Sequence, residues 1–187
     1  MATVEPLLKS YEQFVRLPWQ AGLAGPQKVW MAVYDAPDER RLRARLGAFE
    51  NVTVGAGHPW SACDLIDLFA RWMAAQEYRE SYFESPEDMD MALEDFAQHA
   101  VGVVRGALAA GDERSVVAVH GLASLFGLIR ASKLVDEVAP AIRGRLLVFF
   151  PGEHEGNNFR LLDARDGWNY LAIPITASES RPCSTLN

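Results

Sequence analysis

Three short runs of apolar residues constrain the fold of this chain more than any other feature. They are Val29–Tyr34, Ser115–Val119 and Arg145–Phe150. Each run has the length of a β-strand, is rich in β-branched or aromatic residues, and does not alternate with polar positions. Continuous apolar runs of this kind are typical of strands that are buried on both faces of a parallel sheet.

The segments between these runs have apolar residues at helical spacing, as in Leu42, Leu46 and Phe49. Strands that alternate with helices along a chain are typical of an α/β fold. We therefore expect an α/β three-layer sandwich with a mainly parallel central sheet, helices on both faces, and an antiparallel hairpin at the C-terminus.

Weaker signals complete the predicted topology. The hairpin is expected from 158–163 and 168–176, with its last strand on an edge of the sheet because Pro174 has no N–H to donate. Val52–Val54 indicates a further short strand. Ser61 and Asp64 match the S-x-x-D capping box, which predicts that a helix begins there.

The length of 187 residues corresponds to one domain. We expect this domain to span residues 1–176 and residues 177–187 to form a polar tail. Hydrophobic residues make up 49% of the chain and charged residues 23%, which is typical of a soluble globular protein. The longest apolar run, Leu146–Pro151, is far too short to cross a bilayer, so no membrane association is expected.

Charge and cysteine content bear on partners and compartment. The chain has 18 basic and 25 acidic residues, a formal charge of -7, which argues against general nucleic-acid binding. The arginine-rich segment Arg40–Arg45 leaves open a local contact with phosphates or an acidic partner, and otherwise is a solvated helix face. Two cysteines are too few for a disulfide scaffold, and the N-terminus lacks a signal-peptide pattern, so a reducing cytoplasm fits best.

Polar residues follow three of the predicted strands. Asp35, His120, and the pair Glu153 and His154 come at or just after the strand ends. Ligands bind beyond the carboxyl ends of parallel strands, so these residues predict a polar site, with a metal between them for hydrolysis. The alternative is that they are solvated loop residues. Phosphate-binding and dinucleotide-binding glycine motifs are absent from the sequence, and no cofactor is expected.

Two segments have the composition of a partner-binding surface. Tyr78, Arg79, Tyr82 and Phe83 lie between two predicted helices, and aromatic and arginine side chains are common anchors of protein interfaces. The alternative is that Tyr82 and Phe83 fold inward and close the helix corner. Trp60 is a second candidate for a partner contact, although it also fits a hydrophobic staple before the predicted helix start at Ser61.

The sequence also resembles a known family in five segments that follow one another along most of the chain. These segments are VWMAVYD at Val29–Asp35, GHPW at Gly57–Trp60, GLASLF at Gly121–Phe126, RLLVFFPGE at Arg145–Glu153, and RLLDARDGWNY at Arg160–Tyr170. They resemble the BrxB family, a core component of the BREX bacteriophage-exclusion systems.

The resemblance implies a role in phage defence by a protein that is not itself an enzyme. Members of the family are thought to bind PglZ within complexes that also contain the DNA methyltransferase PglX, and other BREX components are possible partners. This protein would then contact DNA only indirectly, through the other proteins of the complex. The family supplies no catalytic residues, which agrees with the lack of a clear catalytic motif in this sequence.

Overall fold

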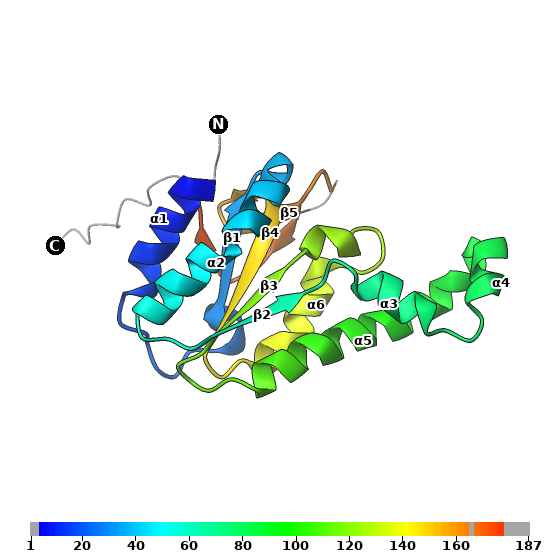
Figure 1. Cartoon of the computed structure of the whole chain (residues 1–187), viewed down its shortest axis with the longest axis horizontal. Coiled ribbons are helices and arrows are strands. Elements are labelled where there is room, and N and C mark those ends of the chain that lie inside the picture. The colour runs from blue at the N-terminus through cyan, green and yellow to red at the C-terminus, as the bar shows by residue number, and fades with distance from the viewer. Residues whose placement is uncertain (1–3, 165–166, 178–187) are drawn as a thin grey trace.

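The computed structural model describes residues 4–164 and 167–177. These residues form a seven-stranded sheet whose main strand order is β2-β3-β4-β1-β7 (Figure 1). All neighbours along this order are parallel. The five strands are β1 (Val29–Tyr34), β2 (Trp60–Asp64), β3 (Val116–His120), β4 (Arg145–Glu155) and β7 (Ile173–Ile175). The predicted α/β fold with a mainly parallel sheet is confirmed.

Helices cover both faces of the sheet. One core packs α1 (Val4–Val15) and α2 (Glu39–Gly55) against side chains such as Trp30 and Phe149. The other core packs α5 (Met89–Ala109) and α6 (Ala131–Val138) against side chains such as Val148. Because successive side chains of a strand point to opposite faces, β1, β3 and β4 each contribute to both cores.

Short helices connect the larger elements. Two are α-helices, α3 (Leu68–Ala74) and α4 (Arg79–Glu84), and five are 3-10 turns: η1 (Gly25–Lys28), η2 (Ala36–Asp38), η3 (Pro86–Asp88), η4 (Leu122–Leu125) and η5 (Ala139–Ala141). Figure 1 shows α3, α4 and the first turns of α5 reaching well beyond the sheet. We call this part, residues 68–91, the arm. No helix in the described ranges is long and apolar enough to cross a membrane.

The C-terminal part contains the expected hairpin but also an arrangement that was not predicted. β5 (Asn158–Leu161) pairs antiparallel with β6 (Trp168–Asn169). β4 does not end at Pro151: it continues to Glu155, turns at Gly156 with φ of +63°, and pairs antiparallel with β5. Pro174 lies on the edge strand β7, as expected, but this strand runs parallel to β1. Of the predicted polar tail, all but Ala177 falls outside the described residues.

Two local predictions are wrong. Val52–Val54 is the last part of α2 rather than a strand, because Phe49 and Thr53 continue the buried face of that helix. Ser61–Asp64 belongs to strand β2 rather than to a helix start, so Trp60 is not a hydrophobic staple. β2 is the edge strand of the sheet and is only partly buried, which removes the continuous apolar run that marks the central strands.

A buried hydrogen bond joins α1 to α2. The Tyr11 hydroxyl lies 2.6 Å from Thr53 Oγ1, and that hydroxyl in turn donates to the Phe49 carbonyl at 2.8 Å. Tyr11 therefore donates to Thr53. Burial raises the pKa of the Tyr11 phenol well above its ordinary value, so this donor keeps its proton at neutral pH.

We predict that Tyr11→Phe lowers the free energy of unfolding by about 1 kcal/mol, the typical net value of one hydrogen bond. Thr53→Val should cost more, about 1–3 kcal/mol, because it leaves the buried Tyr11 hydroxyl without an acceptor. Adding Tyr11→Phe to Thr53→Val should then recover part of the loss. Urea unfolding of the two single variants and the double variant measures this cycle, and strictly additive losses would contradict the assigned bond.

Candidate functional site

A partly buried polar cluster lies at the carboxyl ends of the parallel strands, beneath the first turn of α2. His120 ends β3 and is paired in register with Asp64, which ends β2. The two residues approach to 3.6 Å between His120 Nδ1 and Asp64 Oδ1, which is too long for a hydrogen bond. His120 Nδ1 is buried and has no hydrogen-bond partner among the described residues.

Tyr34 completes this cluster from the end of β1. Its ring is fully buried, and its hydroxyl donates a hydrogen bond to Glu39 Oε2 of α2. Burial raises the pKa of the Tyr34 phenol far above its ordinary value, and the hydrogen bond and charge of Glu39 raise it further. Arg43 is close enough to lower the pKa of both Tyr34 and His120. We call Tyr34, Glu39, Arg43, Asp64 and His120 the strand-end cluster.

The strand-end cluster does not include Glu153 or His154, which the sequence placed in the same polar site. Val119 is in register with Val148, so Glu153 and His154 lie about 13–17 Å farther along β4 than the level of His120. Both are on the β4–β5 ladder: Glu153 forms an ion pair with Arg160, and the His154 ring packs against Phe159 at 4.5 Å between centroids.

Asp35 is also separate from His120. It follows β1 as an exposed residue, and its carbonyl accepts a hydrogen bond from the Asp38 N–H at 2.9 Å. Within residues 4–164 and 167–177, no group of three or more His, Cys, Asp or Glu side chains is placed to hold a metal ion. The geometry therefore gives no support to the metal-assisted hydrolase that the sequence allowed.

Sequence reasoning found His120 but missed its partners. Asp64 fits a helix cap in the sequence because β2 lacks the continuous apolar run of a buried strand. Tyr34 fits the apolar run of its strand, although it is the last residue of β1 just as His120 is the last residue of β3. Cys63, next to Asp64, is buried, and burial raises the pKa of its thiol, which does not favour a nucleophile.

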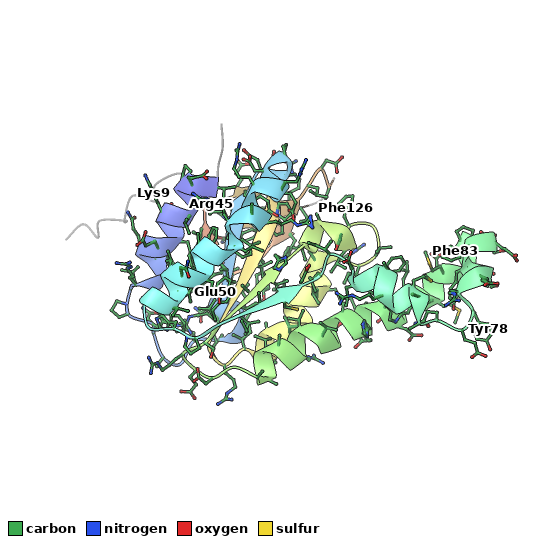
Figure 2. All side chains as sticks on the ribbon, viewed as in Figure 1. Lys9, Arg45, Glu50, Tyr78, Phe83 and Phe126 are labelled. Atoms are coloured by element: carbon green, nitrogen blue, oxygen red, sulfur yellow. The ribbon has the colours of Figure 1, made fainter. Side chains whose placement is uncertain are left out.

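Four of the five partner-binding candidates lie on the arm, where exposed aromatic side chains gather (Figure 2). Tyr78 and Phe83 are 65% and 71% exposed, and Met91, at the start of α5, is 87% exposed. Tyr82 differs, because it is half-buried and packs against the core beneath α5. Each of the two interpretations of this segment therefore holds for one residue. Tyr82 folds inward and closes the helix corner, whereas Phe83 is exposed as a partner-binding residue would be.

Arg79 holds the corner between α3 and α4. Its Nη1 atom donates a hydrogen bond to the Ala74 carbonyl at 2.7 Å. Next to it, the arm has an apolar hollow of about 440 Å³ formed mainly by Phe69, Met73 and Phe83, with Arg79 as its charged member. An apolar hollow beside exposed rings and one guanidinium has the composition of an interface core.

Trp60 lies elsewhere, on the edge strand β2. It is half-buried and packs against the core on the α1 and α2 side of the sheet. The structure therefore does not bring it together with Tyr78 and Phe83.

Comparisons with known proteins add no relative. No protein-family model matches the chain, no curated protein matches it, and no solved structure matches it.

His120 gives the strand-end cluster a pH-dependent stability. Its burial lowers the pKa of the imidazole below the ordinary 6.5, and the nearby Asp64 charge opposes this only in part. Below pH 6.5 the unfolded chain therefore binds a proton more readily than the folded chain. Stability is present above this pH and is lost as the pH falls from 6.5 toward the folded-state pKa.

We predict that His120→Gln makes the free energy of unfolding fall less steeply with decreasing pH, by up to about 1.4 kcal/mol per pH unit. The measurement is urea unfolding in steps from pH 7.5 to ~5. His99→Gln, which replaces an exposed histidine of α5, is the matched control and should keep the wild-type slope. An unchanged slope in His120→Gln would show that His120 has the same proton affinity in both states.

Proposed function

We propose that this protein is a non-enzymatic adaptor of a BREX anti-phage defence system. It binds PglZ through the arm and helps to assemble the complex of PglZ with the methyltransferase PglX, which methylates host DNA and restricts phage. The arm, with Tyr78 and Phe83 exposed beside an apolar hollow, is the observation that carries the binding role. The resemblance of five sequence segments to the BrxB family supports the identity of the partner and a cytoplasmic location.

The arm is larger than the fold requires. β2 and β3 are adjacent parallel strands, and a crossover of a dozen or more residues is enough to join such a pair. Here the connection runs from Leu65 to Ser115, and its first half extends beyond the sheet (Figure 1). Leu68, Trp72 and Met73 of that half are buried in the core beneath the sheet. Tyr78 and Phe83 are exposed instead, so binding is the simpler explanation for this outer part of the arm.

The exposed rings supply the driving force for binding. An aromatic side chain carries about 150–250 Å² of surface, so burying the exposed part of Tyr78 or Phe83 contributes about 2–4 kcal/mol before the entropic cost of association. The neighbouring charges are mostly negative and exposed: Glu77, Glu80, Glu84, Glu87, Asp88 and Asp90. The surface that fits the arm therefore has an apolar centre with a basic rim, and its association rate falls as salt rises.

We predict that Tyr78→Ala combined with Phe83→Ala weakens binding to PglZ by about tenfold or more, because both rings lose their buried contact. The measurement is calorimetric titration of purified PglZ with the full chain. Leu171→Ala is the matched control, because Leu171 is 67% exposed but lies outside the arm. This variant should bind PglZ with the wild-type affinity.

Two results would count against the proposal in different ways. Wild-type affinity in the Tyr78 and Phe83 double variant would show that the arm is not the contact. Absence of any binding between the unmodified chain and PglZ would reject PglZ as the partner. Because both rings are exposed, circular dichroism of the double variant should match that of the wild type and exclude misfolding as the cause of a loss.

A further inference from the structure

A second surface lies at the opposite end of the sheet from the strand-end cluster, where the central strands begin. It is a pocket of about 660 Å³. Lys28 precedes β1, Arg114 precedes β3, and Arg143 and Arg145 stand at the start of β4. Because parallel strands begin at the same edge of a sheet, these separated residues meet in one place. Arg16, just after α1, completes the lining.

The basic side chains of this pocket have few acidic partners. Lys28 Nζ donates to the Ile142 carbonyl at 3.0 Å, Arg114 Nη2 to the Gly57 carbonyl at 2.9 Å, and Arg143 Nη1 to the Gly111 carbonyl at 3.2 Å. In the part of the chain that the structure describes, none of these three cations forms an ion pair. Arg16 does, with Glu12 at 2.7 Å.

Arg145 is the buried member of the group, at 5% exposure. Its two Nη atoms donate to the carbonyls of Gly144 at 2.9 Å and Gln20 at 3.0 Å, and its guanidinium lies 4.7 Å from the ring centroid of Trp19. Among the described residues no carboxylate neutralises it. Burial lowers the pKa of Arg145, because keeping a charge away from water costs free energy.

An aromatic platform fixes the shape of the pocket. The Trp19 ring stacks on the His58 ring at 3.7 Å between centroids with 2° between their planes, and it contacts Trp30 edge-on at 5.4 Å. His58 Nδ1 in turn lies 2.9 Å from the Arg114 carbonyl. The buried Trp19 Nε1 has no hydrogen-bond partner among the described residues. The platform thus leaves a donor free and holds the arginine-bearing loops in place.

The charge balance of this pocket calls for an anion. Five cationic side chains line it against the single carboxylate of Glu113, in a chain whose overall charge is -7. An arginine offers five N–H donors and a lysine three, so each cation has donors left after its bond to a carbonyl. Their mutual repulsion is relieved when a bound anion accepts these remaining donors.

We propose that this pocket binds a compact anion that carries two or more phosphate groups. The fork of an arginine matches the oxygens of a phosphate, and several forks around one pocket fit a ligand with several such groups. An extended nucleic-acid backbone fits less well, because the cations converge on one pocket instead of following a line, and the acidic remainder of the chain repels a long polyanion. The arm plays no part in this site.

The test is calorimetric titration of the full chain with inorganic pyrophosphate and tripolyphosphate at constant ionic strength. The wild type should bind both, more weakly at higher salt. Arg114→Gln combined with Arg143→Gln should weaken binding by about tenfold or more, since it removes two charged donors. Arg40→Gln, on the exposed side of α2, is the matched control and should bind as the wild type does.

Thermal unfolding without ligand shows whether the double variant is folded. If it is not, the titration is done with the Arg114→Gln and Arg143→Gln single variants instead. Binding that is equal in the wild type and the Arg114 and Arg143 variants would overturn the proposal. So would the lack of any heat with either phosphate at millimolar concentration. Citrate is the carboxylate comparison: citrate binding as tight as tripolyphosphate binding would overturn the assignment to phosphate. Tighter binding of a single-stranded oligonucleotide than of tripolyphosphate would assign the pocket to nucleic acid instead.

Discussion

Burial of the central strands on both faces is the constraint on which the rest of the structure depends. Every residue of β1 and β3 is buried, as are the first seven residues of β4. Neighbouring residues in these strands belong to different cores, so a shift of one residue in register would exchange the two cores at once. The register is therefore fixed, and with it the two ends of the sheet at which the polar residues gather.

The same constraint explains which elements the sequence predicts. Val29–Tyr34 is β1 residue for residue, and Ser115–Val119 and Arg145–Phe150 mark β3 and the buried part of β4, because double burial leaves an unbroken apolar run. β2 is an edge strand with exposed positions, so its sequence carries no such run and matches a helix cap by chance. Val52–Val54 has residues with strand propensity, but the buried Thr53 on α2 shows that packing outweighs local preference there.

The sites were less predictable because they depend on which distant residues share a strand end. His120 is indicated by its position at the end of an apolar run, while Glu39 joins the same cluster only through its hydrogen bond with Tyr34. The basic pocket does have a signal in the sequence: Lys28, Arg114 and Arg143 each lie one or two residues before a central strand. Once the strands are taken as parallel, cations before each of them must converge. The sequence does not reveal how the loop at Trp19 packs, and the stacking of Trp19 on His58 shapes the pocket.

α5 relates the arm to the basic pocket in space. This helix begins in the arm at Met89 and ends at Ala109, close to Gly111, whose carbonyl accepts a hydrogen bond from Arg143. Its length places the two surfaces about 30 Å apart. α5 packs as one continuous helix against the sheet and α6. The proposed anion site and the proposed partner contact thus lie at opposite ends of one helix and share no residue. Substitutions at sites this far apart are expected to have additive effects, so a change in the arm should leave the affinity of the pocket at its wild-type value.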